Sequence, residues 1–86
     1  MITPAQLRAA RALLGWDQKT LASRSDLSLP TIQRMESSDE LIRGNVDSLS
    51  KIMNTLAVAG IELIAESAPS SGQGRGVRLI EKAEQA

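Results

Sequence analysis

Residues 17–36 read DQKTLASRSDLSLPTIQRME, and this stretch decides the fold. It holds two short runs with apolar residues at helical spacing, and the Asp26-Leu27 pair separates them. Asp17 and Ser28 each stand where a side chain can cap the amino end of a helix. Two short helices joined by about three residues form the helix-turn-helix pattern. We therefore predict one helix over QKTLASRS and a second that opens at Ser28.

The small and apolar residues of this stretch predict which side of each helix faces the core. A helix-turn-helix needs a small residue facing the turn, a tight bend, and apolar residues that hold the second helix down. Asp26 suits the bend because aspartate tolerates left-handed backbone better than most residues. The residues predicted to face inward are Leu21, Ala22, Ser25, Ile32 and Met35.

Pro30 bears on where the second of these helices begins. Proline disfavours helical geometry at the preceding residue, Leu29, and fits the first full helical position. We therefore predict that the helix starts at Pro30. Because Pro30 has no N–H to be capped, the Ser28 hydroxyl is expected to bond Thr31 or to face a phosphate.

A further helix is predicted before this stretch. Thr3 followed by Pro4 is typical of a helix opening, and the helix should run to about Leu14. Gly15 then supplies a residue that tolerates the left-handed conformation common after a helix end. Trp16 is expected to fill the junction between the first two helices, with stacking against a ligand base as the alternative.

The chain after the helix-turn-helix predicts one more helix and a hairpin. A polar surface loop is expected over residues 37–45, with Asn45 capping a helix over VDSLSKIMNTLAVA, in which Val46, Leu49, Met53 and Leu56 keep helical spacing. Residues 61–66 and 77–80 are rich in branched side chains and flank a segment with proline and glycines, which indicates a β-hairpin. A lone hairpin is marginal in water, so these strands should pack on the helices or pair with a second subunit.

These elements predict a mainly α fold of about four helices plus a short C-terminal β-hairpin. The expected organisation is a helix-turn-helix domain over residues 1–60, a hairpin for dimerisation over 61–81, and a flexible tail over 82–86.

Composition narrows the function. The 86 residues contain no cysteine and no histidine, which removes disulfides, thiolate nucleophiles, imidazole bases and every common zinc ligand set apart from carboxylates. The longest apolar stretch, from Thr55, is too short for a membrane span and carries Glu62. Ten basic and ten acidic residues cancel, so a nucleic-acid surface must arise from local segregation of charge. We therefore expect a cytoplasmic protein with no metal, no cofactor and no catalytic residues.

The segment RALLGWDQKTLASRSDLSLPTIQRMES, residues 11–37, resembles the Xre family of helix-turn-helix regulators, relatives of phage lambda repressor and Cro. The resemblance covers roughly residues 3–60, and the C-terminal AGIELIAES and GVRLI are similar to a bacterial subgroup that ends in a β-hairpin. Asp26 departs from the family's glycine, and Asp39 and Glu40 stand where many relatives carry basic residues, which weakens phosphate attraction there. The matching residues are Arg11, Gly15, Trp16, Gln18, Leu21, Ala22, Ser28, Thr31, Ile32, Met35 and Glu36.

The resemblance implies a lambda repressor-like bundle in which Arg11 and Glu36 form a structural ion pair. The alternative for Arg11 is a free phosphate contact. The amino half of the third helix enters the major groove in such proteins, so the candidates for base contacts are Leu29, Pro30, Gln33 and Arg34. Leu29 has the alternative of a core position beside Leu27.

Several polar residues near this helix are candidates for phosphate contacts. Gln18 lies at the amino end of the second helix, where an amide and a backbone N–H can meet a phosphate, or it is an exposed helper of the cap. Lys19, Arg24 and Arg43 could each contact a phosphate, or each could be a charged side chain exposed to solvent. The predicted phosphate contacts are Gln18, Lys19, Ser28, Thr31 and Arg43.

Taken together, the sequence predicts a bacterial repressor-type regulator that binds double-stranded DNA sequence-specifically through residues 28–36. As a homodimer it would place two recognition helices in half-sites roughly 34 Å apart. The alternative is an antitoxin or interaction module that neutralises a toxin protein through its hairpin or tail and regulates its own operon. An enzyme is disfavoured because the sequence offers no convergent acid, base, nucleophile or phosphate loop.

Overall fold

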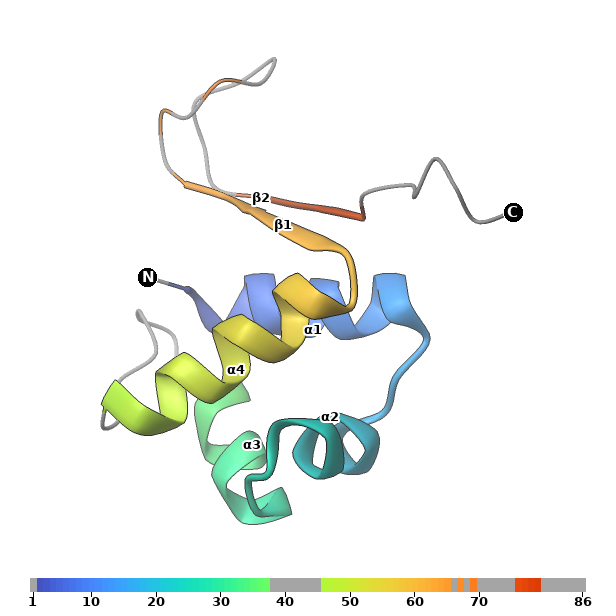
Figure 1. Cartoon of the computed structure of the whole chain (residues 1–86), viewed down its shortest axis with the longest axis vertical. Coiled ribbons are helices and arrows are strands. Elements are labelled where there is room, and N and C mark those ends of the chain that lie inside the picture. The colour runs from blue at the N-terminus through green and yellow to red at the C-terminus, as the bar shows by residue number, and fades with distance from the viewer. Residues whose placement is uncertain (1, 38–45, 66, 68, 70–75, 80–86) are drawn as a thin grey trace.

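The computed structural model describes residues 2–37, 46–65, 67, 69 and 76–79. Within these residues the chain forms four helices followed by two strands (Figure 1). The elements are α1 (Pro4–Leu14), α2 (Gln18–Ser25), α3 (Leu29–Glu36), α4 (Val46–Val58), β1 (Ile61–Ile64) and β2 (Gly76–Leu79). The predicted mainly α class with a short C-terminal hairpin is confirmed.

Local side-chain caps set where the first two helices begin. The Thr3 hydroxyl accepts from the backbone N–H of Gln6 at 3.1 Å, and the Gln6 carboxamide oxygen accepts from the backbone N–H of Thr3 at 3.0 Å. This reciprocal pair is a capping box, which satisfies two backbone donors at the amino end of α1. Asp17 caps α2 by accepting from the backbone N–H of Thr20 at 2.7 Å. The predicted caps at Thr3 and Asp17 are confirmed.

Two residues with left-handed backbone end these helices and turn the chain. Gly15 follows α1 at φ 70°, and Asp26 follows α2 at φ 59°. Glycine adopts this conformation freely, whereas aspartate is one of the few other residues that tolerate it. The prediction that Asp26 fills the bend of the helix-turn-helix in place of glycine is confirmed.

The start of α3 differs from the prediction by one residue. The helix begins at Leu29, with Ser28 as its cap at φ −79° and ψ 154°, so Pro30 is the second helical residue. The first-turn N–H groups of a helix have no partner within the helix, so a proline without one is tolerated at this position too. The cap itself is as predicted, because the Ser28 hydroxyl accepts from the backbone N–H of Thr31 at 3.2 Å.

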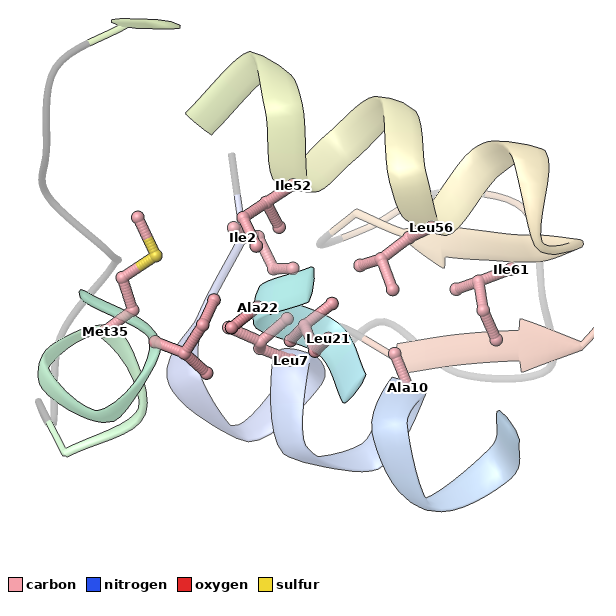
Figure 2. Close-up of a cluster of buried hydrophobic side chains, with 10 residues drawn as sticks. Ile2, Leu7, Ala10, Leu21, Ala22, Met35, Ile52, Leu56 and Ile61 are labelled. Carbon is pink, nitrogen blue, oxygen red and sulfur yellow. The ribbon is translucent and has the colours of Figure 1, made fainter. Parts of the chain in front are cut away.

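The core lies between the helices and beneath the hairpin (Figure 2). In α4 its centre falls on Ile52 and Leu56, while Leu49 and Met53 are only partly buried. Val46 keeps the helical spacing expected for the apolar face, but it is 79% exposed and lies to the side of the buried stripe centred on Ile52, so its place on that face is wrong. The buried hydrophobic residues are Ile2, Leu7, Ala10, Leu21, Ala22, Ile32, Met35, Ile52, Leu56 and Ile61.

The hairpin forms a second layer over the helices. β1 and β2 pair antiparallel, with Ile61 opposite Leu79 and Ile64 opposite Gly76. β1 contacts α4 and β2 contacts α1. Figure 1 shows the hairpin on one side of α1 and α4, with α2 and α3 on the other side. The expectation that the strands pack on the helices is confirmed.

Some expected features fall outside the described residues. These include most of the loop predicted over 37–45 with its Asn45 cap, Glu66 and Ile80 at the predicted strand ends, and the tail over 82–86.

Candidate nucleic-acid interface

The two faces of α3 differ sharply in burial. Ile32, Met35 and Glu36 are buried against the rest of the bundle. Of the four candidates for base contacts, Pro30, Gln33 and Arg34 are exposed and Leu29 is half-buried. Positions 30, 33 and 34 lie at the helical spacings of three and four, so these three side chains share one solvent face.

Two hydroxyl groups, those of Ser28 and Thr31, lie at the amino end of α3. The Ser28 and Thr31 side-chain oxygens lie 2.8 Å apart, and Ser28 is exposed while Thr31 is half-buried. Pro30 has no N–H and the Ser28 hydroxyl accepts from that of Thr31, so this first turn offers the backbone N–H of Leu29 and the partial positive charge of the helix dipole. This end of α3 is therefore suited to lie beside a negatively charged group.

The α2 candidates for phosphate contacts are placed differently from one another. Lys19 is exposed. The Gln18 side chain instead turns inward, and its amide donates to Glu36 Oε1 at 3.0 Å. The Gln18 amide is therefore already hydrogen-bonded within the protein. Arg43 lies outside the described residues.

Glu36 joins three helices. Arg11 of α1 donates to both carboxylate oxygens, from Nε to Oε2 at 2.7 Å and from Nη2 to Oε1 at 2.8 Å. The same guanidinium donates from Nη1 to the Trp16 carbonyl at 3.1 Å, and Arg8 donates to the Glu36 carbonyl. With the Gln18 amide, these bonds tie α1, α2 and the linker between them to the last turn of α3. They fix the exposed face of α3 relative to the bundle.

The electrostatics of this cluster favour the charged pair. Burial alone raises the pKa of Glu36, but hydrogen bonds from Arg11 and Gln18 outweigh it and hold that pKa below its ordinary value. The hydrogen bond to Glu36 in turn raises the pKa of Arg11. Glu36 is 5% exposed. Both groups are therefore charged at neutral pH, and their contacts are those of a structural pair.

Arg24 and Trp16 form a separate contact away from α3. The guanidinium of Arg24 lies 4.8 Å from the centroid of the Trp16 ring, within the range of a cation–π interaction. The Trp16 side chain packs against the core as a partly buried residue, in keeping with the expected role at the helix junction. Both residues line an open hollow of about 330 Å³, which is completed by Asn54, Thr55 and Val58 at the carboxyl end of α4 and by Ala59 just after it.

Sequence reasoning missed two residues that hold the molecule together. Arg8 reaches the carbonyl of Glu36, and nothing in its local sequence signals that contact. Gln6 is 5% exposed and its amide donates to the carbonyls of Ile64 at 3.3 Å and Gly76 at 2.9 Å. The spacing of Thr3 and Gln6 is the signature of a capping box and would have revealed the cap, but not the contact with the hairpin.

Other kinds of site are not seen in the part of the chain that the structure describes. No three acidic, histidine or cysteine side chains gather there as a group able to hold a metal ion. Among the described helices, none has the length and apolar character that crossing a membrane requires.

Comparison with known proteins agrees with this geometry. The sequence model of the family described as Helix-turn-helix matches residues 7–63. The match includes α2, α3, α4 and most of α1, and it ends within β1. No curated protein matches the chain.

Proposed function

The chain belongs to the Xre-type, lambda repressor-like helix-turn-helix family of DNA-binding regulators, and we propose that it is a sequence-specific repressor that binds double-stranded DNA as a homodimer. The observation that carries the proposal is the single exposed face of α3, formed by Pro30, Gln33 and Arg34, on a helix that buried Glu36 anchors. A helix held in this way can enter the major groove without reorganising the bundle.

In this proposal residues 28–36 form the recognition helix. Arg34 donates to a guanine and Gln33 pairs with an adenine, each through two hydrogen bonds in the major groove. Leu29 and Pro30 have no side-chain donors, so they contact thymine methyl groups.

Phosphate contacts position the helix on the duplex. Lys19, Ser28, Thr31 and Arg43 supply them from side chains. For Gln18 we propose the backbone N–H at the amino end of α2, because its amide is already bonded to Glu36.

We further propose that different segments of the chain have different roles. Residues 1–60 bind DNA, residues 61–81 join two copies, and residues 82–86 form a tail. The proposed activity is binding in the cytoplasm of a bacterium, without catalysis, metal or cofactor.

The test compares Arg34→Ala with Lys19→Ala, two exposed basic residues on neighbouring helices. Arg34→Ala should weaken binding to the preferred operator by about 1–3 kcal/mol per half-site and leave binding to random DNA nearly unchanged. Lys19→Ala should weaken both about equally and lower the salt slope by about one for each phosphate that the lysine neutralises. Fluorescence anisotropy at several salt concentrations measures both effects. Unchanged affinity of Arg34→Ala for both duplexes would show that α3 does not read bases.

A second function is proposed on one observation. The hairpin and α3 lie on opposite sides of α1 and α4 (Figure 1), so DNA and a protein partner have separate surfaces to bind. An antitoxin that neutralises a toxin and regulates its own operon would use the molecule in this way. Co-expression with the product of the adjacent gene tests it: relief of growth arrest by the chain supports the antitoxin function, and continued arrest argues against it.

A further inference from the structure

The outer edge of β2 is unoccupied in the described part of the chain. The sheet there contains two strands, and β2 pairs only with β1. An unpaired edge presents backbone N–H and C=O groups that can pair with another strand.

The Gln6 contact shows which backbone groups point to that edge. A single amide nitrogen lies within hydrogen-bonding distance of the carbonyl oxygens of Ile64 and Gly76, which are opposite each other in the ladder. Two opposite carbonyls are this close only in the class of pair whose backbone groups point at one another. The classes alternate along an antiparallel ladder, so the next pair, Leu63 and Val77, points its backbone groups outward. The N–H and C=O of Val77 therefore face the outer edge of β2.

An apolar groove lies beneath this edge. It has a volume of about 300 Å³ and is formed by α1 and β2. Val77 is half-buried toward the helices, whereas Arg78 points to the other face, where its Nη1 lies 2.7 Å from Glu62 Oε1. The residues that line the groove are Thr3, Ala5, Gln6, Ala9, Gly76 and Val77.

We propose that β2 pairs antiparallel with β2 of a second copy, with Val77 directly opposite the partner's Val77. This inference rests on the homodimer of the proposed function and assigns the dimer contact to one edge and one register. This register also avoids repulsion between like charges. With Val77 opposite Val77, Arg78 lies opposite the partner's Gly76, which has no side chain, so the two arginines do not face each other. The Val77 side chains meet over the two apolar grooves.

The pairing also satisfies two requirements of the molecule. It turns a marginal two-stranded sheet into four strands with a face packed on helices, which is enough for independent stability. Antiparallel strands are related by a twofold axis perpendicular to the sheet. Because α3 lies on the far side of α1 and α4 from the hairpin, this axis leaves both α3 helices facing the same way (Figure 1), as binding to one DNA duplex demands.

Cysteine crosslinking tests the register directly, because the sequence contains no cysteine. Under mild oxidation Val77→Cys should form a disulfide-linked dimer, since opposite residues of a ladder have Cα atoms about 5.5 Å apart, within disulfide range. Arg78→Cys is the matched control in the same strand and should stay uncrosslinked, as should Leu63→Cys on β1. Crosslinking through Leu63→Cys in place of Val77→Cys would overturn the assignment to β2.

A proline pair tests the edge without relying on oxidation. Val77→Pro removes an N–H that points outward, which an edge strand tolerates, so the variant should fold and become monomeric by light scattering. Leu63→Pro makes the same change on the outer edge of β1 and should remain dimeric. A dimeric Val77→Pro, or a monomeric wild type at micromolar concentration, would refute the pairing. Operator binding through α3 is measured separately, so failure of this contact is distinguishable from failure of DNA reading.

Discussion

The helix-turn-helix and the hairpin are held in place by different kinds of contact. The helices α2 and α3 begin at side chains only three residues away from the N–H they cap, Asp17 to Thr20 and Ser28 to Thr31. The hairpin is instead held by contacts with distant segments, among them the core packing of Ile61 and the hydrogen bond of Gln6 to Ile64, which is 58 residues away in the sequence.

The difference extends to charge. The proposed recognition helix, α3, is held by the ion pair of Arg11 with Glu36, in which 20% of the Arg11 side chain and 3% of the Glu36 side chain are exposed. The ion pair of the hairpin, Arg78 with Glu62, is about half exposed on both sides. Buried pairs are costly to break on one side, whereas exposed pairs contribute little. The proposed DNA-reading face is thus anchored by a buried ion pair, whereas the hairpin is attached by apolar packing and by the neutral hydrogen bonds of Gln6.

The largest effect should follow from removing Glu36. Glu36→Ala leaves Arg11 partly buried without its partner and should lower the free energy of unfolding by about 3 kcal/mol. Glu62→Ala, the matched change in the exposed pair, should lower it by less than about 1 kcal/mol. Urea denaturation at one protein concentration measures both, since the stability of a dimer depends on concentration. Equal losses in the two variants would contradict the contrast between the regions.

Acid should weaken the helix-turn-helix by a smaller amount. The folded pKa values of Glu36 and Asp17 lie below their ordinary values, because of hydrogen bonds from Arg11 and Gln18 in one case and from Thr20 in the other. Their contribution to stability is therefore complete above the ordinary carboxyl pKa and is lost as pH falls through the folded values.

The measurement is the urea midpoint as a function of pH. Without histidine in the sequence, it should stay nearly constant from about pH 6 to pH 8 and fall below about pH 4.5. The urea midpoint of Glu36→Gln should fall less steeply below about pH 4.5 than that of the wild type. If the midpoints of Glu36→Gln and the wild type fell in parallel, the Glu36 carboxylate would not be a cause of the loss of stability in acid.

Gln6→Glu should loosen the hairpin and spare the start of α1. Glutamate at this position can still complete the capping box with Thr3, but it cannot donate to the carbonyls of Ile64 and Gly76. At neutral pH the ionised carboxylate would also lie buried beside these two carbonyl oxygens, so the expected loss is about 2–3 kcal/mol, most of it in the hairpin. Hydrogen exchange should show faster exchange of the β1 and β2 amides with little change in α2 and α3. Uniform acceleration across all elements would mean that the two regions form one cooperative unit.

The smallest effect is expected at the bend of the helix-turn-helix. Asp26 sits at φ 59°, and its contact with Lys51 is long, at 3.5 Å, and exposed. Asp26→Gly relieves the left-handed backbone at some cost in chain entropy, so stability should rise by about 0.5–1 kcal/mol. Asp26→Ala keeps a residue with a Cβ atom in the left-handed conformation and should lower stability in the same urea measurement, because alanine tolerates that conformation less well than aspartate. Stabilisation by alanine would contradict the assigned strain.

The sequence predicted best what depends on neighbouring residues. The caps at Thr3, Asp17 and Ser28 and the bend at Asp26 follow from side chains within one turn of where they act, and the structure has them all. The predicted start of α3 is wrong by one residue because proline is tolerated at more than one position of a first turn, so its presence does not select one.

Local sequence patterns do not reveal most contacts between distant segments, although the family resemblance implied the pair of Arg11 with Glu36. The Gln18 amide turns to Glu36 and the Gln6 amide reaches two strand carbonyls, and a local pattern does not signal where a flexible amide will find its partner. The inward face of α4 was partly misplaced for a related reason. Val46 and Ile52 both fit a helical stripe, and only packing against the other helices decides that Ile52 is buried.

The central claim is that two copies of α3 read DNA together, and selection of bound duplexes from a random library tests it most directly. The wild type should enrich a site with twofold symmetry whose half-sites lie about 10 base pairs apart, one turn of the duplex. Arg34→Ala should relax the preference at one position in each half-site. Enrichment of no sequence, or of a site that Arg34→Ala leaves unchanged, would contradict the claim.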